Sequence, residues 1–197
     1  MGYALDLNTY EIVVTGGQTA TVHVTDIPQS DPVSILVQKQ DSETSLGVPQ
    51  GGSSLANAEF TIKYFSGLYD INPEEQGIQP TRQWVLKTDE RGFCRLGDKY
   101  KVSGDEFYYL STGDISLPIG TITIQETKAP EGYLINDEVF IRQITSSGTA
   151  ERVETYNAPI IPEQVMRGSV ELYKSDDESG NALAGAVYGI YSTDGRE

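Results

Sequence analysis

The sequence predicts an all-β protein that folds as a two-sheet β-sandwich. Short runs of alternating apolar and polar residues recur along the chain, and glycine, proline, asparagine and aspartate separate them. No segment has the period of a convincing amphipathic helix. About seven short strands of this kind are typical of two packed sheets. The runs that predict strands most clearly are residues 32–41, 58–66, 83–88, 121–127, 138–145 and 150–157.

Two longer segments separate these runs. Residues 70–82 are polar and contain two prolines and a glycine, which predicts a loop. Residues 97–118 predict short strands around residues 107–110, with loops on both sides. Both segments are therefore expected to elaborate the basic sandwich.

The chain repeats itself internally, which predicts an array of similar domains. Residues 34–41 (SILVQKQD) are echoed by residues 169–176 (SVELYKSD), and residues 55–62 (LANAEFTI) by residues 183–190 (LAGAVYGI). The start of the chain echoes the end of its middle part, because residues 2–3, 19–20 and 26–28 match residues 132–133, 149–150 and 157–159.

We therefore expect one complete repeat over residues 31–161. Residues 1–30 would be the C-terminal strands of a preceding repeat, and residues 162–197 the N-terminal strands of a following one. The boundaries, near Ser30 and Met166, both fall close to prolines. Proline stiffens a linker and removes a backbone donor, so a semi-rigid joint between domains is predicted.

Charge and composition exclude several kinds of partner. The chain has 14 lysines and arginines against 29 aspartates and glutamates, a net charge of −15, which repels nucleic acid and anionic lipid. No apolar run approaches a membrane span, so no direct membrane insertion is expected. The single cysteine, Cys94, excludes an intrachain disulfide and is expected to be a buried thiol. The first residues lack signal-peptide features, so the chain is either cytosolic or an internal piece of an exported protein.

Three polar residues are predicted to point inward with apolar neighbours. Side chains alternate between the two faces of a strand. Lys39 shares a face with Val37 and the valine and isoleucine before it, and Glu126 shares a face with Ile122 and Ile124. Asn157 shares the face of Val153 in the last expected strand.

A lysine, a glutamate and an asparagine in one apolar core could react with each other. Burial lowers the pKa of a lysine and raises that of a glutamate, which favours a neutral amine beside a protonated acid. The Lys39 amine would attack the side-chain carbonyl of Asn157, while Glu126 polarises it and carries protons, and ammonia would leave. The alternative is an ordinary ion pair between Glu126 and a lysine that reaches water.

Residues 124–133 (IQETKAPEGY) resemble the E-box of Cna B-type domains, also called SpaA-like or prealbumin-like pilin domains. Residues 39–41 and 55–60 resemble the opening of these domains, and residues 157–159 their closing strand. The resemblance implies an immunoglobulin-like or prealbumin-like sandwich. It also implies an isopeptide bond between Lys39 and Asn157, with Glu126 as its catalyst. By position, Asp26 would be the acceptor of the preceding repeat and Lys174 the donor of the following one.

The function expected from these features is a structural stalk segment of a cell-surface adhesin or pilus-like protein of a Gram-positive bacterium. Its partners would be neighbouring repeats, and its signal and wall anchor would lie outside this segment. The only turnover expected is the single self-cross-linking event, without cofactor or metal, since His23 is the sole histidine. One alternative is an adhesive module whose long loops bind a host protein or glycan. Another is a carboxylate-based glycosidase, for which no acid pair has a recognisable context.

Overall fold

The computed structural model describes residues 2–191. Within them the chain forms eleven β-strands and one short 3-10 helix, η1, at Pro73–Gln76. The strands are β1 (Ser30–Asp31), β2 (Val37–Asp41), β3 (Glu59–Phe65), β4 (Arg82–Lys87), β5 (Phe93–Cys94), β6 (Lys101–Gly104), β7 (Tyr108–Tyr109), β8 (Ile115–Pro118), β9 (Gly120–Lys128), β10 (Val139–Ile144) and β11 (Ile160–Glu163). No helix of these residues is long and apolar enough to cross a membrane.

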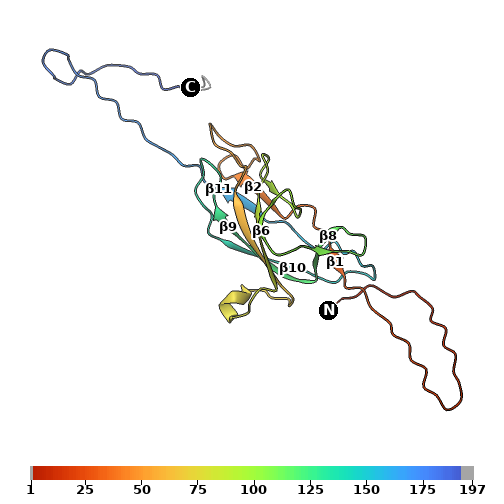
Figure 1. Ribbon diagram of the computed structural model, residues 1–197. Helices are drawn as coiled ribbons and strands as arrows, with labels where there is room; N and C mark the ends of the chain where they lie inside the picture. Colours follow the sequence, from red (N-terminus) through yellow and green to blue (C-terminus); the bar gives the residue numbers. More distant parts are fainter. Residues whose placement is uncertain (1, 192–197) are drawn as a thin grey trace.

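The strands form two main sheets and one small sheet (Figure 1). The larger main sheet has the order β10-β9-β3-β4-β6 and is antiparallel throughout. The second has the order β11-β2-β5, with β11 parallel to β2. A third sheet, β1-β8-β7, lies at the end where the N-terminal segment enters. The all-β prediction is confirmed, and the small third sheet is an addition to the two that were expected.

The core lies between the two main sheets. Alternate residues of β3 and β4 turn inward, as their burial patterns show, while β9 is buried on both faces over residues 120–124. They meet buried residues of the second sheet, among them Cys94, whose thiol is inaccessible as expected. Burial raises the pKa of this thiol, so it stays protonated and unreactive. The central side chains are Val37, Phe60, Ile62, Trp84, Leu86, Cys94, Ile122, Ile124 and Ile161.

The prediction for the last strand is wrong. Residues 150–157 form no strand, and the last strand, β11, begins at Ile160. The Asp31 carboxylate accepts the backbone N–H groups of Thr155 and Tyr156, at 2.6 and 2.9 Å. These donors are therefore not free to pair with a neighbouring strand. The chain joins the sheet only afterwards, and β11 runs past the expected domain end at residue 161.

The two elaborations also differ from simple loops. Residues 70–82 contain η1, whose first turn is capped by the side chain of Asn72. Residues 97–118 carry β6, β7 and β8, and β7 confirms the short strand expected around residues 107–110. The strand β6 adds to the edge of the larger sheet.

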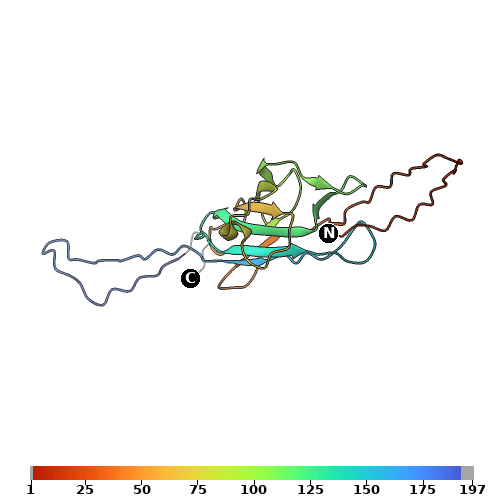
Figure 2. The ribbon, with the colours of Figure 1, turned by 90° about the horizontal axis from the view of Figure 1, so that it is seen from below.

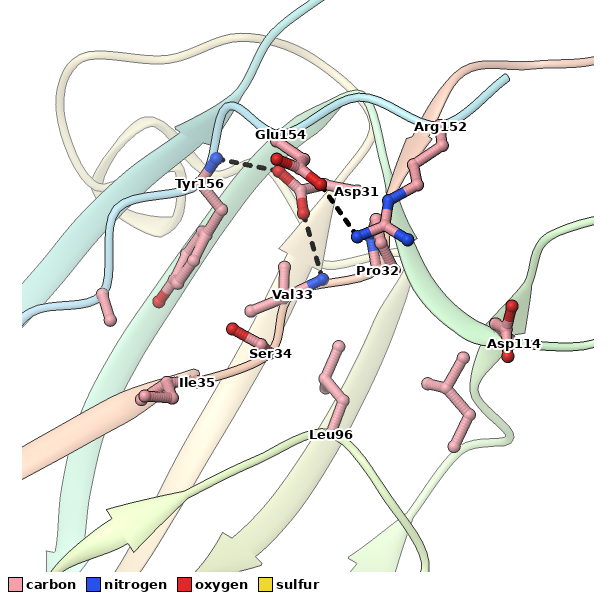
Figure 3. Close-up of a pocket in the computed structure, with 12 residues that line it drawn as sticks. Asp31, Pro32, Val33, Ser34, Ile35, Leu96, Asp114, Arg152, Glu154 and Tyr156 are labelled. Atoms are coloured by element: carbon pink, nitrogen blue, oxygen red, sulfur yellow. Dashed lines mark hydrogen bonds and ion pairs between the residues drawn. The ribbon is translucent and has the colours of Figure 1, made fainter. Parts of the chain in front are cut away.

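Buried polar side chains fix the chain where the N-terminal segment enters the sandwich. The Gln29 side-chain amide donates to the carbonyls of Ser147, Gly148 and Ala150, and Gln29 is buried. Beside it lies a cleft of about 740 Å³, shown in Figure 3. Its polar groups are engaged with one another: Asp31 also accepts the N–H of Val33, and Arg152 pairs with Glu154 at 2.8 Å. The cleft therefore lies where the N-terminal segment meets the sandwich.

The segments outside the sandwich leave it at opposite ends (Figures 1 and 2). Residues 2–28 extend from one end and residues 164–191 from the other, and each segment runs out and back as a long loop. Many of their apolar side chains face solvent, including Leu7, Val13, Val14, Val170, Tyr173 and Val187. The molecule is consequently elongated along the direction that joins the two arms.

Candidate functional site: a buried lysine between two glutamates

Three ionisable side chains meet in the core between the main sheets. Lys39 comes from β2, Glu126 from β9 and Glu163 from β11, and their residues are 0, 3 and 0 % exposed. The Lys39 Nζ donates to Glu126 Oε1 and forms an ion pair with it. The same Nζ lies 2.6 Å from Glu163 Oε1. One lysine thus connects three strands and both sheets, as a charge cluster sealed from water.

The backbone around Lys39 fixes where its side chain points. Its N–H donates to the carbonyl of Gly92 at 2.9 Å. Gly92 has a φ of +75°, and a Cβ there would lie 3.1 Å from the Lys39 carbonyl oxygen and 3.3 Å from its Cβ. A side chain at this position would both strain the turn and press on Lys39. The Lys39 Nζ lies over the Phe60 ring, 4.9 Å from its centroid.

Glu126 is anchored at both carboxylate oxygens. It follows Ile122 and Ile124 on the inward face of β9, as the alternation predicts. Its Oε1 accepts from Lys39, and its Oε2 accepts the backbone N–H of Asn136 at 2.9 Å. A carboxylate held in this way is oriented toward the amine and is ready to exchange a proton with it.

Glu163 is held much less. It is the last residue of β11, where its backbone lies opposite Asp41 of β2, and its side chain is fully buried. Its Oε1 has only the Lys39 ammonium beside it, and within the described part of the chain no group donates to its Oε2. Burial raises its pKa to about 7, against the attraction of Lys39 and with repulsion from Glu126. Near neutral pH a large share of Glu163 is therefore a neutral carboxylic acid.

The structure does not bring Asn157 to Lys39. Asn157 is exposed, and its backbone carbonyl accepts a hydrogen bond from the Arg142 side chain. Lys39 is instead opposite Ile161 in the parallel pair of β2 and β11. Asn157 precedes Ile161 by four positions, roughly 13 Å at the rise of an extended strand. The prediction that Asn157 points inward beside Lys39 is corrected, because the strand that carried that prediction does not form.

Sequence reasoning missed Glu163 for the same reason. In β11, Ile161 and Glu163 are buried, while Ile160 and Pro162 are exposed. This alternation is present in the sequence, but Pro159 precedes the segment and Pro162 lies within it, and proline argues against a strand. The alternation alone makes Glu163 the inward polar residue of the last strand.

The other candidate residues lie far from this site. Asp26 and Lys174 are exposed and belong to arms that extend from opposite ends of the sandwich. His23 is also exposed. Among residues 2–191, no three His, Cys, Asp or Glu side chains are grouped so that they could hold a metal ion.

Comparison with known proteins places this geometry in context. A family model described as a prealbumin-like fold domain, SpaA, matches residues 33–159. A solved structure of the Bacillus anthracis TIE protein is similar, with 24 % identity and a TM-score of 0.49. That match covers 93 % of this chain and 30 % of the other, so the chain spans under a third of that protein. No curated protein matches the sequence.

Proposed function

The chain belongs to the SpaA family of prealbumin-like fold domains, and from this premise we propose that it is a structural stalk segment of a Gram-positive surface protein. The observation that carries the proposal is the Lys39 cluster, which connects the first and last strands of the second sheet through the core. Such a connection serves a domain that transmits tension from one end to the other. The proposed location is the cell surface, with the wall anchor elsewhere in the protein.

The direction of the strands supports a mechanical role. Because β2 and β11 are parallel, the chain enters at one end of this strand pair and leaves at the other. Tension between the two arms would act along the strands and across their shared hydrogen bonds. All of these bonds would then resist together, instead of opening one after another from an end.

We further propose that Lys39 forms an internal amide, with Glu126 as the group that takes its proton. The amine and carboxyl groups are in contact and shielded from water, so their effective concentration is high. The reaction is a single event on the protein itself. An amide between the strands would persist in the absence of disulfides, and no reductant would open it.

Single-molecule stretching tests this proposal. The chain is pulled from handles placed on the two arms, and the expected trace lacks any extension of the residues enclosed by the cross-link. Glu126→Gln, which removes the proton acceptor, should restore that extension. Glu154→Gln is the matched control, because Glu154 is an exposed glutamate outside the cluster. Full extension of the wild-type domain at low force would refute a clamped stalk.

The repeated turn in the C-terminal arm supports a stalk of tandem domains. Asp41 accepts the backbone N–H groups of Glu43 and Thr44, and Asp176 accepts those of Glu178 and Ser179 at the same spacing. Under this proposal the arms are parts of neighbouring repeats, and Asp26 and Lys174 react only when those repeats are complete.

A second candidate function, adhesion, is favoured by a cleft that gathers three cations on an acidic protein. Residues 82–101 hold six of the 14 lysines and arginines. Lys87, Arg91 and Lys99 outnumber Asp89 and Glu90 in a cleft of about 600 Å³ beside the Tyr100 ring. None of the three cations is in an ion pair within residues 2–191. This chemistry suits an acidic glycan, through its carboxylates and a sugar face stacked on tyrosine.

Glycan binding measured by calorimetry tests adhesion. We expect a uronic-acid polymer to bind and its neutral analogue not to bind. The double change Arg91→Glu and Lys99→Glu should abolish binding, whereas Arg152→Glu, at an exposed arginine that lines a different cleft, should not. If the doubly substituted protein bound the glycan as tightly as the wild type, this cleft would be excluded as the binding site.

A further inference from the structure

We propose that the carboxyl group joined to Lys39 is that of Glu163, and that the bond forms with loss of water. This inference rests on the proposed internal amide and names its acceptor. It differs from a bond to Asn157, which would release ammonia. The argument uses only the positions of the three side chains and their partners.

Glu163 is the acceptor that the geometry offers. The Lys39 Nζ has no route to solvent and touches two carboxyl groups, those of Glu126 and Glu163. Glu126 has a hydrogen bond at each oxygen, which stabilises it as a carboxylate and makes its carbon a poor electrophile. Glu163 has Oε1 2.6 Å from Nζ, and no group other than Lys39 approaches either of its oxygens as a donor within the described residues. Its carbonyl carbon is therefore the accessible one.

The protonation states needed for the reaction are within reach. One ammonium faces two carboxyl groups, so a fully ionised cluster would hold an excess negative charge in the core. Burial relieves this excess by keeping much of Glu163 neutral, with a pKa raised to about 7. A neutral carboxylic acid has a better leaving group than a carboxylate, because hydroxide can depart as water.

The reaction balances without any external reagent. The Lys39 ammonium gives one proton to the Glu126 carboxylate, and the free amine attacks Cδ of the protonated Glu163. In the resulting tetrahedral species, a second proton moves from the nitrogen to the departing hydroxyl group by way of Glu126. The C–N bond forms, the C–OH bond breaks, and one water leaves. The products are a neutral amide and a protonated Glu126.

Burial favours this outcome energetically. Before the reaction the core contains an ammonium and a carboxylate, and afterwards all three groups are neutral. The desolvation cost of the charges is thereby removed. Glu126 keeps the N–H of Asn136 on one oxygen and can donate its new proton to the amide oxygen.

Intact-mass measurement of the denatured full chain tests the acceptor. We expect the wild type to lack one water relative to its sequence mass, and peptide mapping to recover a branched peptide joining Lys39 to Glu163. Glu163→Gln should change the loss from water to ammonia at the same junction, since the leaving group is then an amide nitrogen. Glu163→Ala should show the full mass. Asn157→Ala, at an exposed position outside the cluster, should still lose water.

The outcomes separate this inference from the proposed function. Loss of ammonia in the wild type, with a branch at Asn157, would overturn the Glu163 assignment and leave the internal amide standing. A full mass in the wild type would overturn both, because no cross-link would exist. Loss of water that persists in Glu163→Ala would also overturn the assignment. Measuring mass makes each result independent of how much the variants lose in stability.

Discussion

Lys39 and Lys174 stand in matching local sequences but in opposite environments. Each is followed by a turn in which an aspartate two residues later accepts the N–H groups two and three positions further on. In both turns the residue four positions after the aspartate, Ser45 or Gly180, has a positive φ and donates its N–H to the aspartate carbonyl. Yet Lys39 is fully buried and Lys174 is exposed.

The comparison separates what the local sequence determines from what the neighbouring strands determine. The turn forms in both places because its hydrogen bonds are made within a few residues. Burial of the lysine needs β9 and β11 to cover it, and these strands come from distant parts of the chain. The same lysine is therefore a solvated side chain in the arm and a reactive amine in the sandwich.

Removal of the two lysines in turn should give the largest difference between the regions. Lys39→Met leaves Glu126 and Glu163 buried with neither a cation nor an amide partner, and an uncompensated buried charge costs about 3–5 kcal/mol. Loss of the cross-link would remove roughly 5 kcal/mol more, by the chain-entropy model for a loop of this size. Lys174→Met should change the free energy of unfolding by less than about 0.5 kcal/mol. Denaturant titration of both variants measures the change in the free energy of unfolding. Similar changes in the two variants would show that Lys39 contributes no more to stability than Lys174 does.

The pH dependence of stability should distinguish the buried cluster from exposed glutamates. In Glu126→Gln, which we expect to stay unlinked, Glu163 remains titratable. Burial, the main cause of its raised pKa, is unchanged in this variant, so the folded pKa stays above the ordinary value of 4.5 and the folded state binds the proton more tightly. Stability is therefore highest below pH 4.5 and falls as the pH rises through the folded pKa, by about 1.4 kcal/mol for each unit by which that pKa is raised.

The linked wild type should lack this decline, because Glu163 no longer has a carboxyl group to titrate. Unfolding midpoints measured between pH 4 and 8 compare the two proteins. Parallel curves for wild type and Glu126→Gln would argue that Glu163 titrates in both, and hence that no amide forms at this residue.

Alternation along regular strands was sufficient to predict two of the three residues of the cluster. Lys39 and Glu126 lie on β2 and β9, where core residues precede them at every second position: Val37 before Lys39, and Ile122 and Ile124 before Glu126. Such strands can be read from one sequence because the pattern is local. The all-β class and the buried state of Cys94 follow from the same kind of pattern.

The rest depends on contacts that no local pattern contains. Asp31 takes two N–H groups from residues more than a hundred positions away, and this displaced the last strand to β11. The acceptor changed with it, from Asn157 to Glu163. The small third sheet was missed because β1 and β7 have two residues each, too few for any period to appear.

Gly92 offers the finest test of how the sandwich differs from the arm. Lys39 donates its N–H to the Gly92 carbonyl, whereas no glycine among residues 2–191 accepts the N–H of Lys174. Alanine at Gly92 or at Gly113 should cost about 1–2 kcal/mol for the left-handed backbone alone, since φ is +75° and +89°. A Cβ at Gly113 meets nothing within 4 Å, so Gly113→Ala isolates that backbone cost.

Gly92→Ala should cost a further 1–2 kcal/mol or so, because its Cβ presses on the backbone and Cβ of Lys39. It should also lower the fraction of chains that have lost water, since the reaction needs Nζ held close to Glu163. Unfolding titration and intact mass, measured on both variants, compare the two effects. If Gly92→Ala and Gly113→Ala were equal in stability and in cross-linking, β2 would tolerate a shift of Lys39. Covering by β9 and β11 alone would then account for the difference between the two lysines.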